Sequence, residues 1–144
     1  MRRGSGDEGS TVPLVLVFLM IAAGFVVVAA GATALHLERL RLLTVADGAA
    51  LAAAESFRVA DAQVSGGTVV PSLDDREVRA VAAEYLGAAD TAGLSDLRLD
   101  EARTPDGRSA LVRLTATWHP PIASALLPVS VPVTVESTAA ARFR

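Results

Sequence analysis

The sequence has 144 residues, no cysteine and a formal net charge of −3 at pH 7. The lack of cysteine excludes a disulfide framework and thiolate chemistry, and the weakly acidic balance offers no basic face for nucleic acid. Hydrophobic residues make up 51% of the chain and are concentrated near its beginning, as in a membrane protein.

An uncharged apolar run from Val12 to Leu35 follows a short polar segment. It exceeds the roughly 20 residues that an α-helix needs to cross a bilayer, and it therefore predicts a membrane span. Good helix formers continue beyond Leu35, so we expect one helix over residues 11–60 whose second half stands outside the membrane as a rod. Residues 1–10, rich in Gly and Ser, predict a disordered cytoplasmic tail.

The same apolar run has two features of a cleaved signal peptide. Arg2 and Arg3 precede it, and Ala32-Thr33-Ala34 fits the small-x-small cleavage pattern. The run is longer than the usual apolar region of about 7–15 residues, which favours a retained anchor. The two arginines before the run balance Arg39 and Arg41 after it, so the positive-inside rule leaves the orientation open.

Small side chains form a stripe along the predicted span. Gly24 and Gly31 are seven residues apart and share one face of the helix. Ala23 and Ala30 have the same spacing beside them. One interpretation is a packing surface on which another helix approaches closely, and the other is that Gly and Ala are simply common in such helices.

A second stripe runs along the predicted rod, where apolar residues recur at three- and four-residue steps. With one acidic member, it consists of Leu40, Leu43, Asp47, Ala50, Ala54 and Phe57. We expect this strip to dock on a partner or on the rest of the chain. Asp47 has Leu43 and Leu51 four residues away and hence no local cation, so it either pairs with a more distant group or lies at a solvated edge.

Residues 61–72 contain Gly66-Gly67 and Pro71 and predict a linker. Residues 73–144 then predict a small α+β extracytoplasmic domain in which one helix packs on about three antiparallel strands, a pilin-like arrangement with the rod as a further cover. The helix, expected at about residues 74–90, has one apolar stripe. That stripe consists of Val78, Val81, Ala82, Tyr85 and Ala89.

Alternation of apolar and polar residues predicts the strands. Leu97 and Leu99 indicate the first, and the turn signal Pro105-Asp106-Gly107 separates it from the second. The inward residues of the second strand are Val112, Leu114, Ala116 and Trp118, and those of the third are Val129, Val131, Val133 and Val135. Pro132 has no amide hydrogen and is expected at a sheet edge or bulge, and residues 122–128 predict a helical turn or a loop.

No catalytic motif stands out. His36 and His119 are the only histidines, and we interpret them as an interfacial residue and a strand-end residue. Asp74, Asp75 and Glu77 lack the spacing of a calcium loop and fit the first turn of a helix. We therefore expect no catalytic residue, cofactor or metal, and no enzymatic activity.

The order of these features resembles a known family. A polar segment with Gly9-Ser10, a single span, an Arg-containing exit at residues 36–41 and the segment VADGAALAAA at residues 45–54 resemble the TadE/TadG-like proteins of the tight-adherence (Flp) pilus assembly system. The C-terminal VPVTVESTAAARFR also looks like the β-rich end of that family. Leu14 stands where prepilin-like members have Glu, five residues after Gly9, which places the resemblance nearer the TadG-type anchors.

This resemblance implies a non-enzymatic pilin-like or minor-pilin-like protein that acts in pilus assembly and secretion. It would be anchored in the cytoplasmic membrane by one span, with its C-terminal domain outside, and would either enter the cell-surface pilus or assist its assembly. The implied partners are membrane lipid and other pilus-assembly or pilin-like subunits, including copies of this chain. The alternative is a signal-anchored extracytoplasmic binding domain that is unrelated to pili.

Overall fold

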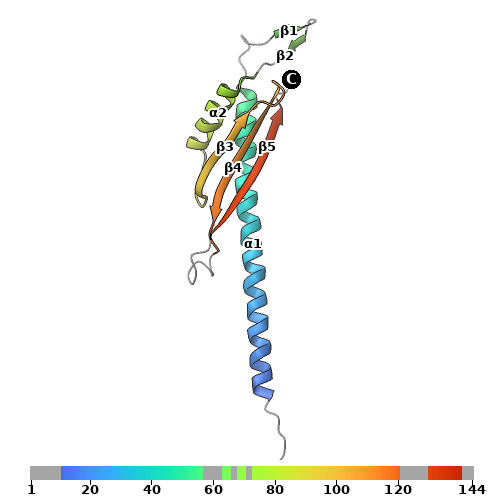
Figure 1. The fold of residues 1–144 in the computed structure, drawn as a ribbon, viewed down its shortest axis with the longest axis vertical. Coiled ribbons are helices and arrows are strands. Elements are labelled where there is room, and N and C mark those ends of the chain that lie inside the picture. Colours follow the sequence, from blue (N-terminus) through green and yellow to red (C-terminus); the bar gives the residue numbers. More distant parts are fainter. Residues whose placement is uncertain (1–10, 57–62, 66–67, 71–72, 121–129, 141–144) are drawn as a thin grey trace, which may run out of the picture.

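The computed structural model describes residues 11–56, 63–65, 68–70, 73–120 and 130–140. A long helix, α1 (Thr11–Glu55), runs along the molecule, and a small sheet and a second helix lie beside its C-terminal half (Figure 1). The chain is therefore α+β, as its sequence predicts. The predicted tail at residues 1–10 lies outside the described residues.

Helix α1 is continuous over 45 residues. Pro13 lies in its first turn, where a missing amide hydrogen breaks no intrahelical bond. The helix ends at Glu55, earlier than the residue 60 expected from helix propensity. The hydroxyl of Ser56 donates a hydrogen bond to the Ala53 carbonyl at 2.8 Å, and this local bond competes with continuation of the helix.

The segment expected to be a linker contains a short antiparallel hairpin. Its strands are β1 (Gln63–Ser65) and β2 (Thr68–Val70), with Gln63 opposite Val70 and Ser65 opposite Thr68. Two glycines stand between the strands in the sequence, and a Gly-Gly pair between two short extended segments is also a hairpin signal.

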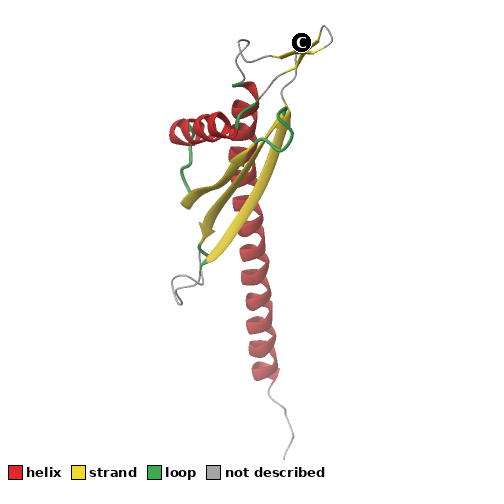
Figure 2. Ribbon diagram, turned by 45° about the horizontal axis from the view of Figure 1, so that its top comes forward, coloured by secondary structure: helices red, strands yellow, loops and turns green. Residues whose placement is uncertain are grey.

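The domain consists of helix α2 and a three-stranded antiparallel sheet in the order β3-β4-β5. The elements are α2 (Asp75–Ala88), β3 (Ser95–Arg103), β4 (Ser109–Trp118) and β5 (Val131–Ala140). Strands β4 and β5 contact α1, whereas α2 contacts α1 and β3 (Figure 2). The expectation that the sheet packs mainly on the second helix is therefore wrong: α1 is the central element, and α2 covers only one side.

The core explains this arrangement. Alanines dominate the buried face of α1, so both the sheet and α2 approach its backbone closely, and α2 itself buries only Val78 and Ala82 completely. The core residues of α1 are Leu42, Ala46, Ala49, Ala50, Ala53 and Ala54. The sheet contributes Val112, Leu114 and Ala116 from β4, and Val133 and Val135 from β5. These strand residues are the inward ones that alternation predicts, and Trp118 and Val131 are half-buried beside them.

Turn and edge chemistry follow the sequence. Between β3 and β4, Gly107 has a φ of 73°, a conformation that glycine adopts without strain. Pro132 is exposed on β5, an edge strand, as its missing amide hydrogen requires. Val129 and the segment 122–128 lie outside the described residues.

Candidate functional site

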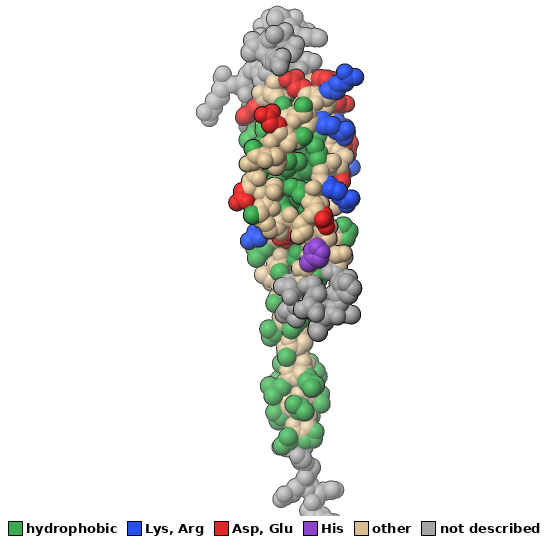
Figure 3. Space-filling view, turned by 90° about the vertical axis from the view of Figure 1, so that its left-hand side faces the viewer, with side chains coloured by type: hydrophobic (Ala, Val, Ile, Leu, Met, Phe, Trp, Pro, Cys, Tyr) green, Lys and Arg blue, Asp and Glu red, His purple; other side chains and the backbone are tan. Residues whose placement is uncertain are grey.

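The N-terminal half of α1 is bare apolar surface. Its large side chains between Val12 and Val28 are 43–77% exposed. An 18-residue window has a mean hydropathy of 2.9 and buries no residue, and the first charged residue of the helix is Glu38. On the face shown in Figure 3, the charged side chains of the described residues lie over the other end of the molecule. This half is long and apolar enough to cross a membrane as a single anchor.

The small-residue stripe lies on this bare half. Ala23, Gly24 and Ala30 are exposed, and Gly31 is half-buried. A Cβ added at Gly24 or Gly31 would meet no atom of its own chain within 4 Å. The stripe is thus open to contact along the described part of the chain, and its role in helix packing stays a prediction.

The structure divides the predicted rod strip between two environments. Ala50 and Ala54 are fully buried and Leu43 is half-buried, but Leu40 is 45% exposed. Asp47 is exposed, and no ion pair joins it to another described residue. Phe57 lies outside the described residues.

The face that packs on the domain is centred on Leu42, Ala46 and Ala53. Alanine is only weakly hydrophobic and occurs on several sides of this segment, so spacing alone does not identify the packed side. The predicted strip therefore lies along one edge of the face of α1 that packs on the domain.

Gly48 provides a close contact that the sequence pattern does not reveal. A Cβ added there would overlap the hydroxyl of Tyr85 and would lie 2.6 Å from the Cζ atom of the same side chain. The ring of Tyr85, on α2, therefore lies directly against the α1 backbone. The available signal was a glycine within an otherwise Ala-rich helix, because such a glycine often marks close packing.

The outer face of the sheet carries a cross-strand charge network. Arg113 Nη1 lies 2.7 Å from Glu101 on β3, and Nη2 lies 2.5 Å from Glu136 on β5. The hydrogen bond from Arg103, aided by the charge of Arg113, lowers the pKa of Glu101 below its ordinary value of 4.5. The hydrogen bond to Glu136 raises the pKa of Arg113. The network links the three strands and leaves no acid free for general acid–base work among its members.

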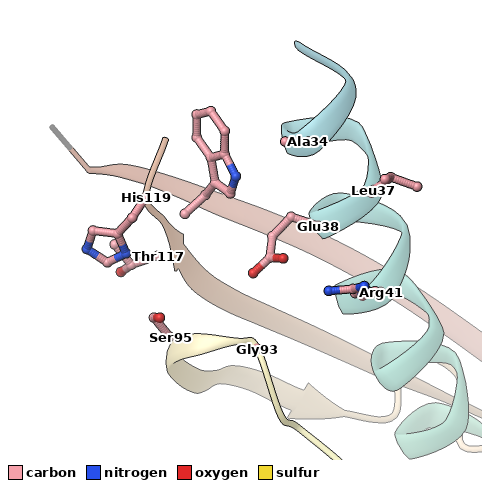
Figure 4. Close-up of a pocket in the computed structure, with 9 residues that line it drawn as sticks. Ala34, Leu37, Glu38, Arg41, Gly93, Ser95, Thr117 and His119 are labelled. Carbon is pink, nitrogen blue, oxygen red and sulfur yellow. The ribbon is translucent and has the colours of Figure 1, made fainter. Parts of the chain in front are cut away.

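A cavity of about 310 Å³ lies where α1 leaves the sheet, at the end of the domain nearest the bare half. In Figure 4, Glu38 and Arg41 project from α1 toward Ser95 and Thr117, while Leu37 points away. The remaining lining residues are Ala34, Gly93, Trp118 and His119. Glu38, which lies off the predicted strip, is only 9% exposed and has no ion pair with another described residue.

The two histidines lie beside different cavities. His119 lines the cavity with Glu38, and His36 lines a second one of about 490 Å³ with Arg39 and residues 131–134. Both histidines are exposed. Among the residues that the structure describes, no three His, Cys, Asp or Glu side chains are grouped so as to hold a metal ion.

Comparisons with known proteins do not identify this chain. No protein-family model, curated protein or solved structure matches it.

Proposed function

We propose that this protein is a non-enzymatic, membrane-anchored pilin-like or minor-pilin-like component of tight-adherence pilus assembly and secretion. The observation that carries the proposal is the division of α1 into two halves. Its N-terminal half is bare and apolar, and its C-terminal half forms the central element of a small α+β domain. A helix that is apolar all round stays in lipid until other helices take the place of that lipid. Such a helix suits a subunit that assembles through its anchor.

The resemblance to TadE/TadG-like proteins supports the same proposal. Its most specific part is VADGAALAAA at residues 45–54. In the structure this segment packs against the sheet and α2, with Ala46, Ala49 and Ala50 fully buried. Small residues at these positions therefore have a physical reason, because larger side chains would push the domain off its helix.

The proposal places the protein in the cytoplasmic membrane as a single-pass protein with its domain outside. The stripe of Gly24, Gly31, Ala23 and Ala30 would contact other pilin-like subunits or a second copy of the chain. Helices with small residues at such positions approach closely and gain van der Waals contact in lipid.

Cell fractionation tests the proposal. Cells that carry a C-terminally tagged copy are sheared to release surface fibres, and protease is added to intact, wall-permeabilised cells. A tag in the fibre fraction would support a structural subunit, and a protease-sensitive tag that stays in the membrane with co-purifying pilus proteins would support an assembly factor. A fully protected tag would contradict the topology and the proposal with it.

A matched pair of double variants tests the stripe. Gly24→Leu with Gly31→Leu fills the stripe, whereas Ala22→Leu with Ala29→Leu enlarges small residues at the same spacing on the opposite face. We expect the first pair alone to reduce co-purification of partner subunits. Equal effects of both pairs would show that the stripe has no special role.

The extracytoplasmic binding domain is the second candidate, and the cavity beside Glu38 favours it. This candidate predicts a tagged protein that stays in the membrane, is protease-sensitive and retains no pilus component. The same fractionation therefore separates the two functions.

A further inference from the structure

The cavity beside Glu38 lies at the depth of lipid headgroups when α1 spans a bilayer. Glu38 follows Leu35, the end of the apolar run, by three residues, or about 4.5 Å of helix. The polar zone on each side of the hydrocarbon core is roughly 5–8 Å thick. Trp118 lines the same cavity, and tryptophan is enriched at this level of membrane proteins. The cavity thus lies at the level of the headgroups when α1 spans a membrane.

One wall of the cavity carries a carboxylate that could face a cation. Glu38 is 9% exposed as a residue, its side chain projects into the cavity, and no ion pair joins it to another described residue (Figure 4). The Glu38 carboxylate oxygens are open to the cavity rather than enclosed in protein, and an ammonium group beside them would form a charge-assisted pair. Trp118 lines the same space, and aromatic rings also attract ammonium groups.

A second wall suits a phosphate. Arg41 lies three residues after Glu38, less than one turn along α1, and its Nη1 would be 3.6 Å from a Cβ added at Gly93, on the rim of the cavity. No ion pair joins Arg41 to another described residue. Its guanidinium is a good phosphate donor, and the hydroxyls of Ser95 and Thr117 line the same space.

We propose that this cavity binds the phosphoethanolamine headgroup of an aminophospholipid from the leaflet that adjoins the domain. The ammonium group lies against Glu38 and Trp118, the phosphate lies against Arg41, and the acyl chains follow the bare surface of α1. A cationic side chain of a partner protein would pair with Glu38 and would leave the exposed guanidinium of Arg41 to water. The zwitterionic headgroup satisfies both, and the bilayer presents it at the mouth of the cavity.

Lipid retention by the purified full-length chain tests the proposal. The protein is placed in nanodiscs with equal amounts of phosphatidylethanolamine and phosphatidylglycerol, and the lipids retained after transfer to detergent are counted by native mass spectrometry. Trp118 is the only tryptophan in the sequence, so its fluorescence reports occupation of the cavity directly. We expect preferential retention of phosphatidylethanolamine and a shift in the Trp118 emission that saturates with its mole fraction.

Two variants and two controls locate the site. Glu38→Gln and Arg41→Gln should each reduce the retained phosphatidylethanolamine about tenfold, as expected when one charge-assisted hydrogen bond is lost. Arg39→Gln and Glu55→Gln change the same charges at exposed positions of the same helix and should leave retention unchanged. A thermal unfolding curve for each variant separates loss of the site from loss of the fold.

Three results would overturn the proposal: equal retention of both lipids, unchanged retention in folded Glu38→Gln, or unchanged retention in Arg41→Gln. Soluble O-phosphoethanolamine is added in a separate arm, and binding as tight as that of the lipid would assign the site to a soluble ligand instead. The assay and the fractionation both require α1 to span the membrane. The assay needs no pilus component, so the two proposals fail separately.

Discussion

At the scale of single residues, Gly48 allows α2 to rest on α1. The ring of Tyr85 occupies the space that a Cβ at this position would need. Gly87, on α2, is also helical, but nothing lies within 4 Å of a Cβ added there. The two glycines therefore make opposite predictions for the same substitution.

Gly48→Ala should lower the free energy of unfolding by about 1–3 kcal/mol, because the added methyl group overpacks the contact with Tyr85. Gly87→Ala should raise it by about 0.5–1 kcal/mol, because alanine loses less backbone entropy than glycine when a helix forms. Thermal unfolding of the full-length protein in detergent, followed by circular dichroism, measures both. In a Tyr85→Ala background the loss at Gly48 should disappear, and a loss that persists there would refute the contact.

Asp106 makes the hairpin turn sensitive to pH. Its Oδ1 accepts hydrogen bonds from the Ser109 hydroxyl at 2.7 Å and from the amides of Arg108 and Ser109 at 2.9 and 2.7 Å. The hydroxyl bond, followed by the amide bonds, lowers the pKa of Asp106 below its ordinary value of 3.8. A lowered pKa in the folded state means that stability is fully present above pH 3.8 and is lost as pH falls through the lower, folded pKa.

Asp106→Asn should therefore reduce the unfolding temperature most at neutral pH and progressively less as pH falls below 3.8. Unfolding curves of wild type and variant between pH 6 and pH 2, in steps of about one unit, measure the difference. Ser109→Ala, which removes only the hydroxyl bond, should show a weaker form of the same trend. A difference that is constant with pH would contradict the role of the ionised carboxylate.

At the scale of elements, local patterns predicted much of the fold. The second helix, the strands and the turn at Gly107 follow from periods of 3.6 and 2 and from turn residues, all of which act over short stretches of chain. Pro132 even indicated the edge strand. The sequence did not show which side of α1 packs on the domain. The packed face consists mostly of alanine, and the sheet and α2 together define it.

The candidate sites divide in the same way. The apolar half of α1 and its small-residue stripe are visible in sequence, because composition alone defines them. The cavity is not, because it joins Glu38 to Ser95 and Trp118, which are far away along the chain. The available signal for the cavity was Glu38, a charged residue just beyond the predicted span, but a residue at such a position is ordinarily solvated.

Leu42 and Leu40 distinguish the observed face of α1 from the strip expected from spacing. Leu42→Ala should cost about 2–5 kcal/mol of stability, because Leu42 is fully buried and its truncation leaves a cavity. Leu40→Ala should cost no more than about 0.5 kcal/mol, because Leu40 is 45% exposed. Denaturant unfolding of both variants measures the two costs, and equal losses would mean that the face is assigned incorrectly.

At the scale of the whole molecule, the domain includes the C-terminal half of the helix whose N-terminal half is bare and apolar. Among the residues that the structure describes, six of the sixteen in the core cluster come from α1. A chain of residues 67–144 lacks all six and would expose the inner face of the sheet to water.

We expect residues 33–144 to unfold cooperatively in solution and residues 67–144 to show no cooperative transition. Circular dichroism of the two fragments during heating provides the test. A stable fold of residues 67–144 would show that α1 is dispensable for the domain and would favour an autonomous binding module over an assembly subunit.

The continuity of α1 also has a mechanical consequence. Proline occurs only in its first turn, so no proline kink separates the apolar half from the half that carries the sheet. A force applied to the domain is therefore transmitted along the helix axis without a joint to absorb it. If the apolar half lies in lipid as proposed, pulling on the domain would draw this half lengthwise through the membrane, and tilting it would turn the domain with it.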